Sequence, residues 1–358
     1  MKKPIISGIQ QIGIGVSDVY EGWKWYRRNF GMDIPMFDEA AEAALMLPYT
    51  GGEPRSRHAI LALNKQGGGG MEIWQYTSRT PVGPAFVPQL GDLGIYIAKV
   101  KSRNVSKTFQ FLKQKNADLI SDIVIDPAGQ EHFYVKDPFD NIFDVVPSDN
   151  WFTSSNFSTG GMYGCTIGVS NIDESLKLYR DVLGYNEVVY DETNNFADYK
   201  ELPSGEGKFR RILLRHSADQ RKGAFSKMLG KSEIELVQSV DRNVDKIFRD
   251  RLWGDLGYIH LCFDVNGMSA LKELCSSKGF PFTVDSCPDD TPSFDMGDAA
   301  GHFTYIEDPD GTLIEFVETH KIPLMKKFNW FLDLRKRNPE KPLPNWMLKT
   351  LALNRVKD

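Results

Sequence analysis

Residues 304–317, TYIEDPDGTLIEFV, decide the fold of this protein because they repeat residues 133–146, FYVKDPFDNIFDVV, without a gap. In this alignment Asp144 falls on Glu315. Each stretch is a tight Asp-Pro turn that leads into an apolar strand with one carboxylate in its middle. A lone buried carboxylate costs several kcal/mol unless something compensates its charge. We therefore expect solvent, a cation or a metal to compensate the charge of Glu315.

A strand and then an amphipathic helix precede both stretches. LGIYIAKV leads into NVSKTFQFLKQKNA, and YIHLCFDV leads into GMSALKELCSSKGF. Two further units begin IQQIGIGVSDVYEGWKWYRRNFGM and MYGCTIGVSNIDESLKLYRDVLGY, and they end in MEIWQY and IELVQS. Alternating apolar residues in the strands and three- and four-residue spacing in the helices predict four units of strand, helix and three strands, βαβββ.

These units predict an α+β fold in two halves, residues 1–150 and 162–320, with two units in each. The polar stretch WFTSSNFSTGG, residues 151–161, is interpreted as the linker between them. Residues 321–358 contain ten Lys or Arg against three acids. We expect this basic tail to form helices that pack on the body of the protein or on a second subunit of a homodimer.

The composition of the chain excludes some classes of function. The 358 residues carry a formal charge of −5, which argues against nucleic acid as a partner because phosphate binding needs a basic surface. No apolar run approaches the roughly 18 residues of a membrane span. The four cysteines lack CxxC spacing. We therefore expect a reduced, cytoplasmic protein that acts on a small-molecule substrate.

The four units resemble the vicinal oxygen chelate superfamily, which includes glyoxalases, bleomycin resistance proteins and extradiol dioxygenases. The resemblance covers roughly residues 8–320 and depends on the repeat, on IGVSDVYEGWKWYRRNFGM and on DPDGTLIEF. It implies that pairs of units form cupped, barrel-like mixed sheets around a divalent metal, with ligands from the first and last strand of each unit. The implied positions in the four units are Gln11 and Glu72, Gly94 and Asp144, Gly164 and Glu235, and His260 and Glu315.

Glycine has no side chain that could bind a metal, so the complete set is Gln11, Glu72, His260 and Glu315. This set is similar to that of glyoxalase I, and it requires the first unit to pair with the fourth. Pairing within each half would instead leave Glu235 with His260 and Glu315. The glycine in place of a second histidine counts against ring-cleaving chemistry, because a two-histidine, one-carboxylate face suits Fe(II) for binding oxygen.

The resemblance implies proton transfer next to a carbonyl. A site of carboxylates, an amide and one imidazole fits Zn, Ni, Co, Mn or Fe as a divalent ion. The cation would stabilise the enediolate that forms when a C–H proton leaves a small hydroxy-carbonyl compound, and Glu315 or Glu72 would take the proton. We expect an isomerase, epimerase or lyase, with His302 in contact with the substrate.

Two alternatives remain open: an extradiol-type dioxygenase with Fe(II), and a resistance-type protein that binds its ligand without turning it over. The resemblance to glyoxalase I does not extend to glutathione binding. The positions expected to hold its basic and amide side chains are Gly15, Leu256 and Tyr76.

Overall fold

The computed structural model describes residues 3–155, 157–216, 222–288, 293–296, 299–325 and 330–356. It contains the four predicted units in the predicted order. The first unit comprises β1 (Ile5–Gly15), α1 (Val19–Phe30), β2 (Ile34–Glu42), β3 (Ser56–Leu63) and β4 (Gly70–Tyr76). The second comprises β5 (Gly94–Ser102), α2 (Val105–Gln114), β6 (Asp118–Leu119), β7 (Val124–Ile125), β8 (Glu131–Lys136) and β9 (Ile142–Pro147).

The second half of the chain repeats this order. The third unit comprises β10 (Thr159–Gly168), α3 (Ile172–Tyr179), β11 (Glu187–Asn194), β12 (Phe209–Arg215), the short α4 (Ser226–Leu229) and β13 (Glu233–Ser239). The fourth comprises β14 (Gly257–Asn266), α5 (Met268–Ser277), β15 (Val284–Asp285), β16 (Phe294–Met296), β17 (Ala299–Glu307) and β18 (Leu313–Met325).

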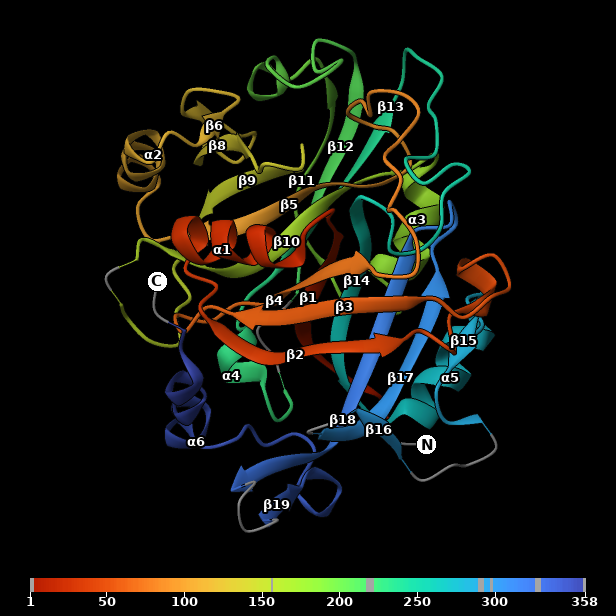
Figure 1. Ribbon diagram of the computed structural model, residues 1–358. Coiled ribbons are helices and arrows are strands. Elements are labelled where there is room, and N and C mark those ends of the chain that lie inside the picture. Colours follow the sequence, from red (N-terminus) through yellow and green to blue (C-terminus); the bar gives the residue numbers. More distant parts are fainter. Residues whose placement is uncertain are drawn as a thin grey trace.

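The units pair into two mixed sheets that curl into half-barrels, and each sheet joins one unit from either half of the chain. The outer sheet, made by the first and fourth units, has the order β15-β17-β18-β14-β1-β4-β3-β2. The inner sheet, made by the second and third units, has the order β11-β12-β13-β10-β5-β9-β8-β6. Figure 1 shows the inner sheet above the outer sheet, with α1 and α3 between them.

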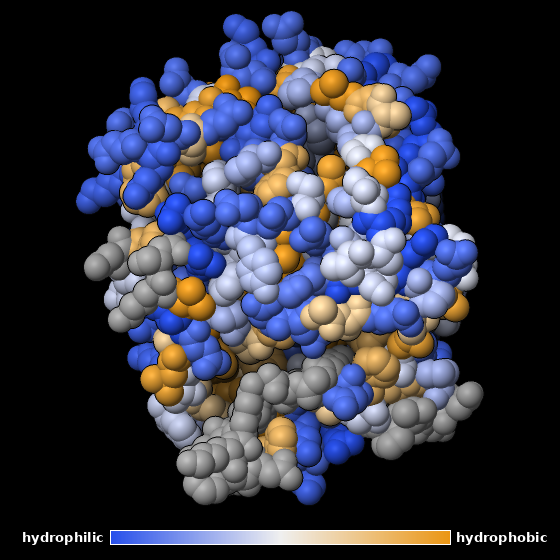
Figure 2. All heavy atoms as spheres, viewed as in Figure 1, coloured by the Kyte–Doolittle hydropathy of each residue, from blue (hydrophilic) through white to orange (hydrophobic). Residues whose placement is uncertain are grey.

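One hydrophobic core fills the space between the two sheets. Residues of both sheets, such as Ile12 and Leu236, belong to the same buried cluster as Tyr26 of α1 and Tyr179 of α3. Side chains of a strand alternate between its two faces, so the opposite faces of the sheets are left to line the half-barrels. The face of the molecule seen in Figure 2 is mostly hydrophilic. Within the described residues, no helix is both long and apolar enough to cross a membrane.

The Asp-Pro turns that revealed the repeat make the same hydrogen bonds in both halves. Asp308 accepts bonds from the backbone N–H groups two and four residues later, and Asp137 does the same. Tyr179 of α3 donates its hydroxyl to the second oxygen of Asp308 at 2.9 Å, and Tyr26 of α1 donates to Asp137. Each buried turn is therefore tied to the helix of the preceding unit.

The tail differs from the predicted helices. β18 extends to Met325, and β19 (Trp330–Asp333) pairs with it antiparallel. In the described part of the tail, the α-helical segment is α6 (Asn345–Lys349), followed by a 3₁₀ turn at Thr350–Asn354. Prolines 339, 342 and 344 lack the N–H groups that a longer helix would need. The last three residues of the predicted linker, 159–161, belong to β10.

We predict that Tyr179→Phe lowers the free energy of unfolding by roughly 1–2 kcal/mol, because the buried carboxylate of Asp308 loses a donor. Urea denaturation would measure the change. Tyr20→Phe is the matched control, since the Tyr20 hydroxyl lies at 3.3 Å from the exposed Asp38 and should contribute little. Equal midpoints for the two variants would contradict this role of the turn.

Candidate metal centre

The centre of the outer sheet brings together the four predicted ligands. β1 and β14 pair antiparallel with Gly13 opposite His260. Each strand also pairs in parallel with the last strand of its own unit, which places Glu72 beside Gly13 and Glu315 beside Cys262. Because paired residues share a face of a sheet, these registers direct both glutamates and the imidazole to the inside of the half-barrel.

The distances within the group are short. His260 Nε2 lies 3.2 Å from Glu72 Oε2 and 3.2 Å from Glu315 Oε2. Gln11 Nε2 donates a hydrogen bond to Glu72 Oε2 at 2.9 Å. His260 is fully buried, and the other three residues are at most 8% exposed. Glu72, His260 and Glu315 thus each offer an atom within 4.8 Å of the others.

Several buried atoms in this group lack hydrogen-bond partners among the described residues. They are both ring nitrogens of His260, Glu315 Oε2 and Gln11 Oε1. The imidazole Nε2 is close to both carboxylates without making a hydrogen bond of good geometry to either. Buried polar atoms are normally satisfied, so four unpartnered atoms in one group make it a candidate site for a cation. One nitrogen and several oxygens form a donor set that suits a divalent cation.

The three titratable groups perturb one another. Burial raises the pKa of Glu315, and although His260 opposes this rise, the charge of Glu72 adds to it. Burial lowers the pKa of His260, but Glu315 and Glu72 outweigh it and raise the pKa above the ordinary value. Burial also raises the pKa of Glu72, yet the adjacent imidazole of His260 and the charge of Arg57 bring it below the ordinary value. The imidazole therefore lowers the pKa values of both carboxylates, and each carboxylate raises the pKa of the imidazole.

Aromatic side chains enclose the imidazole. Trp253 stacks on His260 with ring centroids 6.1 Å apart and an angle of 15°, and Tyr305 meets its edge at 5.7 Å. Trp74 packs against Trp253 at 4.8 Å. The sequence reasoning missed these residues. Tyr305 could have been found, because it lies in the repeated stretch, whereas Trp253 lies between β13 and β14 where no periodicity marks it.

His302 is not brought to the group. In the β17–β18 pair, Tyr305 is opposite Glu315 and faces the half-barrel, whereas His302 is opposite Glu318 on the other face. There His302 Nε2 lies 2.6 Å from Asp285 Oδ1. His302 and Tyr305 are three positions apart, and because side chains alternate along a strand, an odd separation places them on opposite faces. The placement does not support the predicted contact of His302 with the substrate.

The register also corrects one predicted position in the inner sheet. Lys99 lies beside Asp144 in the β5–β9 pair, as Cys262 lies beside Glu315. His260 precedes Cys262 by two residues, and Ile97 precedes Lys99 by two residues. The place of the ligand in the second unit is therefore Ile97, and the prediction of Gly94 was wrong. Pairing with β9 fixes the register, which no local feature of β5 reveals.

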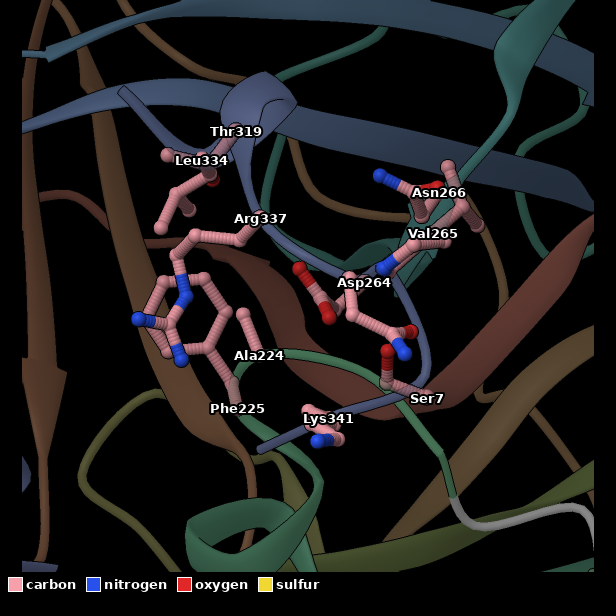
Figure 3. Close-up of a pocket in the computed structure, with 12 residues that line it drawn as sticks. Ser7, Ala224, Phe225, Asp264, Val265, Asn266, Thr319, Leu334, Arg337 and Lys341 are labelled. Carbon is pink, nitrogen blue, oxygen red and sulfur yellow. The ribbon is translucent and has the colours of Figure 1, made fainter. Parts of the chain in front are cut away.

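A small cavity lies farther along the half-barrel, between β14 and the tail (Figure 3). Its volume is about 20 Å³, which suffices for about one water molecule. The carboxylate of Asp264 points into it, and burial raises the pKa of Asp264 to about 7. Ser7 and Arg337 also line it. The cavity is too small for a substrate.

Comparison with known proteins assigns a segment in the second half of the chain to a family. The model of the Glyoxalase/Bleomycin resistance protein/Dioxygenase superfamily matches residues 163–316. This segment belongs to that superfamily. The members of this superfamily are mostly metal-dependent enzymes that act on small molecules. None of the curated proteins matches the sequence significantly.

Solved structures extend the likeness to most of the chain. A putative dioxygenase from Bacillus subtilis is 13% identical with a TM-score of 0.58, and the match covers 88% of this chain and 86% of that one. Glyoxalase I from Zea mays is 13% identical with a TM-score of 0.52, covering 88% and 92%. At these identities the likeness shows that the chain shares the fold of these two proteins.

We predict that Gly13→Ala lowers the thermal stability, because a methyl group there would lie 2.5 Å from the His260 ring. Overpacking of this kind costs roughly 1–3 kcal/mol. Gly83→Ala is the control, since its methyl group would meet only Leu256 Cδ1 at an ordinary 3.8 Å. Thermal unfolding of both variants would measure the difference. An unchanged Gly13→Ala protein would show that His260 is not confined as described.

Proposed function

We propose that this protein is a divalent-metal-dependent enzyme that moves a proton next to a carbonyl group, as an isomerase, epimerase or lyase. The observation that carries the proposal is the convergence of unpartnered buried atoms from Gln11, His260 and Glu315 on one point beside Glu72. These four residues would hold the metal. A group with a single imidazole and two carboxylates favours this chemistry over ring cleavage, which uses a second histidine.

The cation, when bound, supplies the positive charge that stabilises an oxyanion on a carbonyl substrate. The two glutamates differ in the hydrogen bonds that their Oε2 atoms accept. Glu72 Oε2 is held by the amide of Gln11, whereas Glu315 Oε2 accepts no hydrogen bond within the described chain. Glu315 Oε2 therefore takes the proton from the substrate carbon, and Glu72 acts as the fixed ligand. An epimerase would also use Glu72 to handle the proton on the second face.

The walls of the half-barrel favour a small hydroxy-carbonyl substrate with an apolar or planar remainder. Trp253 and Tyr305 border the ligand group with aromatic surface. A glutathione adduct is disfavoured. A side chain at Gly15 would overlap the backbone oxygen of Asp255 at 2.0 Å, so no arginine fits there. Tyr76 packs in the aromatic cluster instead of offering an amide.

The first test of this function is metal content. We expect one divalent metal per purified chain, and His260→Ala should lower the occupancy sharply because it removes the nitrogen ligand. His302→Ala is the matched control, since this partly buried histidine lies on the opposite face of the outer sheet and its removal should leave the occupancy unchanged. Elemental analysis after dialysis measures both. Equal occupancy in the two variants would contradict the assigned ligand set.

The second test separates the base from the ligands. Glu315→Gln keeps an oxygen that can bind metal but removes the base, so solvent-deuterium exchange into hydroxy-ketones should fall about 10²- to 10⁴-fold per bound metal. Mass spectrometry would follow the exchange. If Glu72 only binds metal, Glu72→Gln should lose exchange in proportion to its metal. Full exchange per bound metal in Glu315→Gln would remove Glu315 from the role of base.

A further inference from the structure

The inner sheet has a buried charged cluster at the position that corresponds to the ligand group of the outer sheet. Glu235 lies beside Thr166 in the β10–β13 pair as Glu72 lies beside Gly13. Asp144 lies beside Lys99 in the β5–β9 pair as Glu315 lies beside Cys262 in the β14–β18 pair. The two carboxylate positions are therefore kept, while the two ligand positions on β10 and β5 are Gly164 and Ile97. The largest difference between the two sheets is that Lys99 stands where the outer sheet has the thiol of Cys262.

The ammonium group of Lys99 lies among three carboxylates. Lys99 Nζ is 3.0 Å from Glu235 Oε2, 3.4 Å from Glu233 Oε1 and 3.6 Å from Asp144 Oδ2. All four residues are at most 3% exposed. Burial lowers the pKa of Lys99, but the three carboxylates outweigh it and raise the pKa above the ordinary value. The lysine is therefore a buried cation surrounded by three carboxylates, two from β13 and one from β9.

Further contacts close the cluster. Arg211 makes ion pairs with two carboxylates. Its Nη1 lies 2.6 Å from Asp198 Oδ2, and its Nε contacts Glu235 Oε1. His132 bridges Asp144, at 2.9 Å, and Asp198, at 3.3 Å. Burial lowers the pKa of His132, yet these two carboxylates raise it to about 9. In the inner sheet, basic side chains thus neutralise the carboxylates. In the outer sheet, the equivalent carboxylates of Glu72 and Glu315 are available to a cation.

We propose that the inner cluster is a second metal-type centre in which the Lys99 ammonium occupies the place of the cation. The centre is closed to metal and acts as a structural ion-pair cluster. Removal of the ammonium leaves an excess of buried negative charge, which destabilises the fold. It also opens a site whose carboxylates, Asp144 and Glu235, are hard oxygen ligands for a divalent ion such as Mn²⁺. The comparison with the outer centre rests on the proposed function.

The test is made in full-length His260→Ala protein, so that the outer centre does not contribute. Lys99→Ala added to this background should gain about one equivalent of Mn²⁺ after dialysis, and Mn²⁺ should raise its melting temperature. A stronger version is Ile97→His with Lys99→Cys, which rebuilds the pair that His260 and Cys262 form in the outer sheet. Asp144→Asn should abolish the gain.

The matched control is Lys101→Ala. Lys101 is also fully buried on β5, but its ammonium donates to the backbone oxygen of Asn150 at 2.8 Å and makes no ion pair among the described residues. This variant should gain no metal. Lys99 variants that fold without gaining Mn²⁺, or that fail to refold even with Mn²⁺, would overturn the proposal.

Two results for the unmodified chain separate this proposal from the proposed function. No metal in either the unmodified chain or His260→Ala would refute the outer site, while the gain in the Lys99 variants would still support the inner one. Two equivalents in the unmodified chain, one of them lost in Asp144→Asn, would show that the inner centre binds metal beside Lys99, and would overturn the proposal.

Discussion

The antiparallel pairing of β1 with β14 is the constraint on which the rest of the outer sheet depends. It sets Gly13 opposite His260, and the parallel partners of the two strands then bring Glu72 and Glu315 to the same place. A shift by one residue would turn all these side chains to the other face of the sheet. The glycine is part of the same constraint, because the imidazole occupies the space that a larger side chain would need.

The two sheets show two solutions to one electrostatic problem. Each buries carboxylates at equivalent positions of the last strands, and a buried carboxylate must be compensated. In the inner sheet Lys99, Arg211 and His132 provide the positive charge. In the outer sheet the single imidazole of His260 faces two glutamates and leaves ligand atoms unpartnered. The same framework therefore supports an ion-pair cluster in one sheet and a group with unpartnered buried atoms in the other.

The helices and turns hold these sheets in register. The shared core places α1 and α3 between the sheets, and their tyrosines reach the Asp-Pro turns that precede β9 and β18. These two strands carry Asp144 and Glu315. The turn bonds that made the repeat visible in the sequence thus also fix the start of the strands that present the two carboxylates.

The sequence by itself determined the four units and the strand positions of Glu72, Asp144, Glu235 and Glu315, because turn chemistry and alternation are local properties that a repeat makes visible. The tertiary structure alone decided which units pair, that Ile97 replaces Gly94 at the ligand position, and that the tail adds a strand. It also decided the partners of Lys99, although a lysine inside an apolar strand already indicated a buried charge in the sequence. These features depend on register and on contacts between residues far apart in the chain, which local patterns do not encode.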